Sequence, residues 1–247
     1  MLMNEYYIGK YLKDSGKLYK ISRSKIELYI NCKRCFYLDR KMKISPPPGF
    51  PFNLNSAVDN LLKNEFDFYR DLKKPHPYIL KLGLNAIPFQ NKMLENWRNN
   101  FKGVSYDHKR YKFHLFGAVD DVWINTDNDE LIVVDYKSTS KSSDVTIDED
   151  WQISYKRQME FYQYLLRKNN FKVSDTGYFV YCNGLRNKKK FDEKLNFKVS
   201  LLPYKGNDLW VEKVISKIYN LLQSDEIPSI NENCSLCEYQ EKTKPLI

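Results

Sequence analysis

The spacing of apolar and polar positions along the chain indicates where helices and strands form. Apolar residues that recur every three to four positions, with polar residues between them, are typical of helices that bury one face. Ser24 followed by Glu27 fits a capping box at the start of the first such segment. On this basis we expect helices over residues 24–41, 55–70, 91–100, 151–170 and 207–224.

Runs rich in β-branched and aromatic residues predict strands over 110–125, 130–139, 175–184 and 195–204. The first two runs flank the turn sequence TDND, which predicts a β-hairpin. SPPPGFPF, residues 45–52, cannot lie inside a helix and predicts a rigid extended link. The order of helix, strands, helix and strand predicts an α/β sandwich around a mixed sheet.

Composition supports a folded, basic protein. The 247 residues are 42% hydrophobic and 15% aromatic, enough for a substantial core. Forty Lys and Arg against 31 Asp and Glu give a net charge of +9, which favours a polyanionic partner such as nucleic acid. An AT-rich genome, which enriches lysine codons, would explain the same excess.

No apolar run approaches the roughly 20 residues that cross a bilayer, and no secretory signal is recognisable at the start. We therefore expect no membrane association and a cytoplasmic location, in a host's cytoplasm if the gene belongs to a phage. Paired disulfides are rare in that compartment. The five cysteines need another explanation.

Charged residues end the apolar run LIVV at positions 131–134. Asp135 and Lys137 are two apart in a strand and therefore face the same side, while the hairpin brings Asp120 beside Asp135. Two adjacent carboxylates repel unless a hard cation such as Mg²⁺ or Mn²⁺ lies between them. Lys137 could then orient a water and offset charge on a phosphate. From the spacing alone, an ordinary salt bridge explains the pattern equally well.

Gln158 and Tyr162 lie four residues apart in the expected helix 151–170 and share one of its faces. Their amide and phenol groups could contact a phosphate or a sugar. An amide beside a core tyrosine is the alternative, and these two residues alone favour it.

Four cysteines form two C-x-x-C pairs, Cys32 with Cys35 and Cys234 with Cys237. Four thiolates in this arrangement suit zinc or an iron–sulfur cluster, with free thiols as the remaining alternative. A metal held by both pairs would connect the first helix to the C-terminal segment. Cys182, within a strand, is expected to be a small buried residue.

Taken together, GAVDDVW, IVVDYK and QMEFY resemble the PD-(D/E)XK nuclease superfamily in its RecB-like branch. The shared pattern is G-x-x-D, then D-x-K, then Q-x-x-x-Y, in this order and at similar spacing. SRSKIELYINCKRCFYLDRK and the C-terminal CSLC extend the resemblance, which covers residues 22–237. It implies a restriction-endonuclease-like α/β core, with a mixed sheet flanked by helices.

The resemblance also implies roles for individual residues. Asp120, Asp135 and the backbone carbonyl of Tyr136 would hold Mg²⁺ or Mn²⁺, and Lys137 would position the attacking water. Gln158 and Tyr162 would engage the DNA. The branch usually has a histidine ligand in an early helix, where this chain has Asp59, whose carboxylate also suits these metals.

Iron–sulfur nucleases of this branch include CRISPR-associated and AddB-like exonucleases, and the resemblance favours a [4Fe-4S] cluster over Zn²⁺ at Cys32, Cys35, Cys234 and Cys237. Those relatives join one N-terminal cysteine to three C-terminal ones, whereas this chain has two pairs. We expect residues 1–247 to form one RecB-like nuclease domain. Within it, segments 22–44 and 225–247 would make a subdomain joined by the cysteines.

The resulting expectation is a metal-dependent DNA nuclease, specifically an exonuclease on single-stranded DNA. No Walker G-x-x-x-x-G-K-[ST] motif occurs, so strands or free ends would come from a helicase or a recombination or replication partner. A structure-specific endonuclease and a non-catalytic DNA-end-binding adaptor are the alternatives. The residues leave open the cleavage polarity, the choice between DNA and RNA, the oligomeric state and the pathway.

Overall fold

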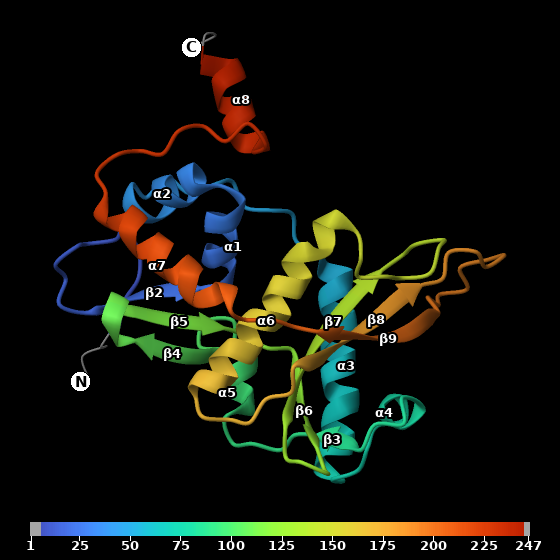
Figure 1. Ribbon diagram of the computed structural model, residues 1–247. Helices are drawn as coiled ribbons and strands as arrows, with labels where there is room; N and C mark the ends of the chain where they lie inside the picture. Colours follow the sequence, from blue (N-terminus) through green and yellow to red (C-terminus); the bar gives the residue numbers. More distant parts are fainter. Residues whose placement is uncertain (1–5, 245–247) are drawn as a thin grey trace. The chain divides into compact units, whose positions relative to one another are not determined.

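The computed structural model describes residues 6–244 and divides them into two compact units, shown in Figure 1. The first unit contains residues 6–50, 105–117 and 209–244, and the second contains 51–104 and 118–208. No described helix is long and apolar enough to cross a membrane. The strands are β1 (Tyr6–Tyr7), β2 (Leu18–Ser22), β3 (Ala86–Pro88), β4 (Val104–His108), β5 (Phe113–Gly117), β6 (Asp121–Asn125), β7 (Leu131–Thr139), β8 (Thr176–Gly184) and β9 (Phe197–Lys205). The α-helices are α1 (Arg23–Asn31), α2 (Lys33–Lys41), α3 (Asn53–Asp71), α4 (Pro77–Lys81), α5 (Leu94–Arg98), α6 (Ile153–Lys168), α7 (Trp210–Gln223) and α8 (Ser235–Thr243).

The second unit is built on a mixed sheet of five strands in the order β3-β6-β7-β8-β9. β6 and β7 pair antiparallel, with Asp121 opposite Val134, which confirms the predicted hairpin. β7 and β8 are parallel neighbours, and β8 and β9 are antiparallel. The architecture is mixed α/β, as the sequence predicts.

Two helices cover opposite faces of this sheet. Side chains of β7 alternate between the faces, and the face that carries Ile132, Val134 and Tyr136 packs against α3. The opposite face turns toward α6, whose Gln158 bonds to Asp135. α6 approaches closely because β8 has Gly177, where a Cβ atom would lie 2.4 Å from the sulfur of Met159. Asp135 and Lys137 therefore lie on the α6 face, at the end of a buried strand.

The prediction of a single strand over 110–125 is wrong. The segment forms β5 and β6, which belong to different sheets, and residues 118–120 between them are irregular. Backbone groups at the break bind residues of α5 instead of a neighbouring strand. The N–H of Val119 donates to the carbonyl of Trp97 at 3.1 Å, and Arg98 Nε donates to the carbonyl of Asp120 at 3.0 Å. A strand needs those groups for its ladder, so pairing stops here.

The first unit contains a four-stranded sheet in the order β1-β2-β5-β4, with β1, β2 and β5 mutually parallel where they pair. Helices α1 and α2 pack against α7. The apolar residues of α7 that are buried, Val211, Ile215, Ile218 and Leu222, follow helical spacing, as expected for segment 207–224.

The helix predicted over 24–41 is two helices, α1 and α2, which meet at Cys32. Cys32 is extended, with φ −156° and ψ 108°, and serves as the N-cap of α2. Its sulfur accepts the N–H of Cys35 at 3.4 Å. The start is also shifted, because Ser22 is the N-cap of α1, and no side-chain capping bond forms there. The helix breaks where the first cysteine pair begins.

Candidate active site and cysteine cluster

The β6–β7 hairpin brings Asp120 and Asp135 together. Asp121, the first residue of β6, pairs with Val134, so Asp120, one position before the strand, lies beside Asp135. Oδ2 of Asp120 accepts the backbone N–H of Tyr136 at 2.9 Å. One carboxylate is thus held by the backbone of the strand that carries the other.

Asp135 is fully buried, and its two oxygens have different surroundings. Oδ1 accepts a hydrogen bond from Gln158 Nε2 at 2.8 Å. Oδ2 is in ion-pair contact with the Lys137 ammonium. A metal ion bound to Asp135 would share this oxygen with Lys137 or replace the ammonium there.

Lys137 lies between the carboxylates and an aromatic ring. Its pKa is raised, because attraction to Asp135 and Asp120 outweighs burial, which alone would lower it. Its nitrogen lies 4.6 Å from the ring centre of Tyr155, a cation–π distance. Lys137 is therefore a fixed positive charge at the end of β7.

Asp59 projects from α3 into the same cavity as Asp120 and Lys137. The cavity has a volume of about 310 Å³. Lys63, one turn further along α3, pairs with the Asp59 carboxylate at 2.7 Å. Among the described residues, only the cysteines bring three or more ligand atoms within 4.8 Å of one another, so Asp59, Asp120 and Asp135 form a looser set.

The carboxylates oppose each other's ionisation. Burial and the nearby Asp135 charge raise the pKa of Asp120 to about 6. Burial and Asp120 likewise raise the pKa of Asp59. A divalent cation between these groups would relieve the repulsion, and carboxylate oxygens are the ligands that Mg²⁺ and Mn²⁺ prefer. The residues present thus fit such a metal.

Gln158 and Tyr162 lie together on α6, as their spacing predicts. Gln158 Nε2 donates to the hydroxyl of Tyr162 at 3.2 Å as well as to Asp135. Tyr136 turns to the opposite face, where its hydroxyl donates to Asp121 Oδ2 at 2.8 Å. The DNA contacts of Gln158 and Tyr162, and metal ligation by the Tyr136 carbonyl, stay predictions.

Sequence reasoning missed seven residues that line the 310 Å³ cavity: Phe52, Asn55, Ser56, Val58, Leu62, Ser138 and Tyr155. Tyr155 precedes Gln158 by three residues on α6, so helical spacing was a usable signal for it. Asn55 Nδ2 donates to the carbonyl of Ser138 at 3.1 Å, joining the start of α3 to the end of β7. No local pattern marks Phe52 or Ser138.

A second cavity of about 450 Å³ shares five lining residues with the first: Phe52, Asn55, Val58, Ser138 and Tyr155. Its other walls are largely apolar and include Leu54, Leu195 and Phe197. Phe52 is 72% exposed and Phe197 is 36% exposed. An apolar, partly aromatic hollow therefore opens beside the carboxylates.

A buried ionic network holds the residues next to the site. Arg98 bonds both oxygens of Asp67, at 2.7 and 2.9 Å, and Oδ1 of Asp121 at 2.9 Å. Arg70 contacts the same two carboxylates. Because Asp121 follows Asp120, and Arg98 also binds the Asp120 carbonyl, this network fixes the backbone of the catalytic candidate.

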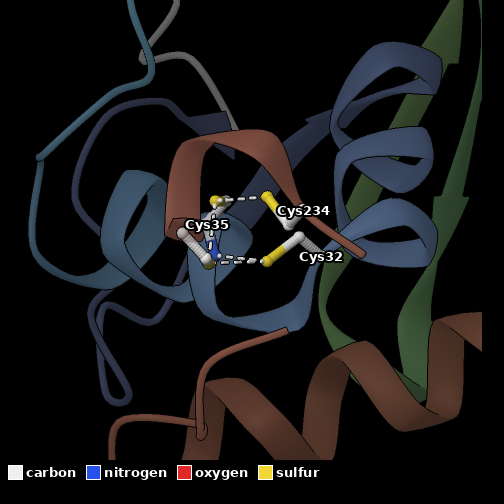
Figure 2. Close-up of side chains that lie close together, drawn as sticks. Cys32, Cys35 and Cys234 are labelled. Atoms are coloured by element: carbon white, nitrogen blue, oxygen red, sulfur yellow. Dashed lines mark hydrogen bonds between the residues drawn. The ribbon is translucent and has the colours of Figure 1, made fainter. Parts of the chain in front are cut away.

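The four cysteines converge within the first unit, as Figure 2 shows for Cys32, Cys35 and Cys234. All except Cys234 are buried. Burial raises the pKa of the Cys35 thiol, whereas hydrogen bonds from backbone and neighbouring thiols outweigh burial and lower the pKa of Cys234. The set is chemically suited to zinc or to an iron–sulfur cluster. Cys182 lies in the core of the other unit, as expected.

Comparison with known proteins identifies the family. A family model described as the PD-(D/E)XK nuclease superfamily matches residues 53–241. The chain therefore belongs to this superfamily, whose members are nucleases that use divalent metals. Among solved structures, the crystal structure of SSO0001 is similar over 88% of this chain and 82% of that one, with 14% identity and a TM-score of 0.37. No curated protein matches the chain.

Proposed function

We propose that this protein is a metal-dependent deoxyribonuclease that acts as an exonuclease on single-stranded DNA. The observation that carries the proposal is the joint placement of Asp120, Asp135 and Lys137 at one end of the β6–β7 hairpin, beside an open cavity. Membership of a nuclease superfamily supports phosphodiester hydrolysis as the reaction.

The metal site would be formed by carboxylates. Asp120 and Asp135 would hold Mg²⁺ or Mn²⁺, with the Tyr136 carbonyl and Asp59 as further ligands. The bound cation would make water more acidic and polarise a phosphoryl oxygen. Asp135 can serve as a ligand without a rotamer change, because Gln158 already holds its other oxygen.

Lys137 would act on the phosphate. Its ammonium is fixed by Asp135 and the Tyr155 ring, so it can orient the attacking water and offset the charge that develops on the phosphate. Gln158 and Tyr162 would contact the DNA backbone near the scissile bond. The overall step adds water across a P–O bond of the phosphodiester. One product keeps the phosphate and the other gains a hydroxyl group.

The preference for single strands is supported by the 450 Å³ cavity. Base stacking on aromatic rings is a sequence-tolerant way to hold unpaired DNA. Phe52 and Phe197 are exposed there, and the cavity shares five lining residues with the carboxylate cavity. A paired base could not enter it without leaving its helix.

The test is degradation of labelled DNA by the full chain with Mn²⁺, Mg²⁺ or EDTA. Asp135→Asn removes the ligand charge with little change of shape, and Asp71→Asn is the matched control, because Asp71 is exposed at the end of α3. We expect metal-dependent loss of single-stranded DNA from a free end, retained by Asp71→Asn and reduced at least a thousandfold by Asp135→Asn.

Blocked ends, circular strands and duplexes with flaps separate the alternatives. Cleavage of circular or flapped DNA would establish a structure-specific endonuclease instead. Tight DNA binding without cleavage under any metal would favour the adaptor. Equal loss of RNA would remove the restriction to DNA. Labels at either end would report the polarity.

A further inference from the structure

We infer that Cys32, Cys35, Cys234 and Cys237 bind a single tetrahedral metal ion, Zn²⁺, and not a [4Fe-4S] cluster. This goes beyond the proposed nuclease function and does not depend on it. The inference rests on the separations of the four sulfur atoms and on the matching backbone geometry of the two pairs.

The sulfur atoms are close to one another across the two pairs. Sγ of Cys32 lies 3.6 Å from Sγ of Cys237, and Sγ of Cys35 lies 3.6 Å from Cys234 and 4.0 Å from Cys237. All four sulfurs lie within 4.8 Å of one another. The four sulfur atoms are therefore all close to one another, as the four corners of a small tetrahedron are.

These separations match one ion. A Zn–S bond of about 2.3 Å places two thiolates of a regular tetrahedron about 3.8 Å apart. The three measured distances, 3.6, 3.6 and 4.0 Å, lie on both sides of that value. An ion at the centre would therefore need little movement of the side chains.

An iron–sulfur cube does not match them. In a [4Fe-4S] cluster each thiolate binds a different iron, and the sulfides of the cube keep the four thiolates roughly 6 Å apart. Sulfurs at 3.6 Å are in van der Waals contact and leave no space for a cube between them. A cluster would require both pairs to separate by about 2 Å, although three of the cysteines are buried.

A disulfide does not match either. A disulfide bond is about 2.05 Å long, and the measured sulfur separations exceed that by well over 1 Å. The four thiols are free in the structure.

The two pairs have the same local design. Cys32 is the extended N-cap of α2 and Cys234 is the extended N-cap of α8, with ψ of 108° and 110°. In each pair the second cysteine is the third residue of the helix that follows. Two C-x-x-C turns that face each other in this way are typical of four-cysteine zinc sites, in which each turn supplies one edge of the tetrahedron.

The experiment is metal analysis of the full chain, expressed with both iron and zinc supplied and purified without oxygen. We expect one zinc per chain, no acid-labile sulfide, no broad absorbance near 400 nm, and zinc K-edge spectra that give four sulfur neighbours. Exchange with Co²⁺ should give the intense visible bands of a tetrahedral thiolate site.

Two matched variants test whether the metal is bound by the four cysteines. Cys234→Ala removes the most accessible ligand, and Cys182→Ala alters a cysteine of the other unit. We expect the first to lose zinc and the second to retain it. If Cys234→Ala is insoluble, zinc release from the native chain on titration of its thiols with a mercurial replaces it, with four thiols titrated per zinc.

Three outcomes would overturn the inference. Brown protein with about four irons and four sulfides per chain would establish the cluster. One iron without sulfide would keep the single-ion geometry but reject zinc. Protein without bound metal after anaerobic purification would reject both. Because the readouts are metal content and spectra, a failure of the nuclease assay leaves them unchanged.

Discussion

The backbone N–H of Tyr136 donates to Oδ2 of Asp120 at 2.9 Å, so Asp120 is bound to the strand that carries Asp135 and Lys137. A backbone donor cannot rotate away as a side chain can. The separation of the two carboxylates therefore follows from the register of the β6–β7 hairpin. Such fixed placement reduces the reorganisation that metal and substrate binding require.

Arg98→Ala should destabilise the second unit strongly. The Arg98 side chain is 8% exposed and holds Asp67, Asp121 and the Asp120 carbonyl. Its loss leaves the buried Asp121 with Arg70 as its remaining guanidinium partner and removes the donor to the Asp120 carbonyl. We expect the free energy of unfolding to fall by about 2 kcal/mol, measured by urea denaturation. The control Arg167→Ala removes a more exposed arginine and should cost under about 1 kcal/mol. Similar losses in both variants would contradict a special role for the buried network.

Asp59→Ala and Lys63→Gln should have opposite effects on metal dependence. Lys63 binds the Asp59 carboxylate at 2.7 Å and would compete there with a metal ion. Removing the carboxylate should raise the half-saturating Mn²⁺ concentration by about tenfold or more, while removing the lysine should lower it. Nuclease rates over a Mn²⁺ titration measure both. Identical titration curves for the two variants and the native chain would show that Asp59 is no ligand.

Tyr155→Leu should slow the reaction more than Tyr155→Phe. Phenylalanine keeps the ring face 4.6 Å from Lys137, whereas leucine removes it. A partly desolvated cation–π contact contributes about 1 kcal/mol, so we expect kcat to fall about fivefold in the leucine variant. The phenylalanine variant should stay within about twofold. An equal loss in both would assign the effect to the hydroxyl instead.

Phe52→Ala should weaken binding of single strands selectively. Loss of one stacked base costs about 1–3 kcal/mol, which is about 5- to 150-fold in affinity. Binding of labelled oligonucleotides to the Asp135→Asn background with Ca²⁺ avoids cleavage, and duplex binding should be unchanged. Phe68→Ala, from an exposed ring on α3 outside the cavity, is the control. Matched losses for single strands and duplexes would exclude the stacking role.

His76 should make the second unit less stable in acid. Burial lowers its pKa, against the opposing pull of Glu65 and Asp121. Its Nδ1 accepts the N–H of Tyr78 at 3.1 Å and Nε2 bonds Glu65 at 2.9 Å, a pattern that needs the neutral ring. The unfolded chain therefore takes up the proton first, and this contribution to stability is complete above about pH 6.5 and decreases as the pH falls below it.

The measurement is urea denaturation between pH 8 and 5 for the native chain and His76→Gln. Glutamine can accept and donate without titrating, so its stability should vary less over this range. The native chain should lose up to about 1.4 kcal/mol per pH unit more than the variant. Parallel curves would show that His76 does not control the acid response.

Periodicity predicts the parts of the site that lie within one element. The period of two in a strand places Asp135 and Lys137 on one face, and the helical period places Gln158 beside Tyr162. The hairpin follows from its turn sequence. In each case the geometry is local, so a short stretch of sequence contains the necessary information.

The failures depend on partners that are distant in the sequence. The strand over 110–125 breaks because Trp97 and Arg98 occupy backbone groups at 119 and 120. The helix over 24–41 breaks at Cys32, whose closest sulfur across the pairs belongs to Cys237, 205 positions away. No window of the sequence contains both members of such a contact. Phe52 likewise lines the cavity beside Ser138 and Tyr155, which are far from it in the sequence.

The first unit is discontinuous, since its three segments are separated by those of the second, and the cysteine pairs lie in its first and last segments. During synthesis, Cys32 and Cys35 leave the ribosome long before Cys234 and Cys237 exist. The four-thiolate site can therefore close only when nearly all of the described chain has been made. A chain cut short before position 234 would contain the second unit but only one of the two cysteine pairs of the first.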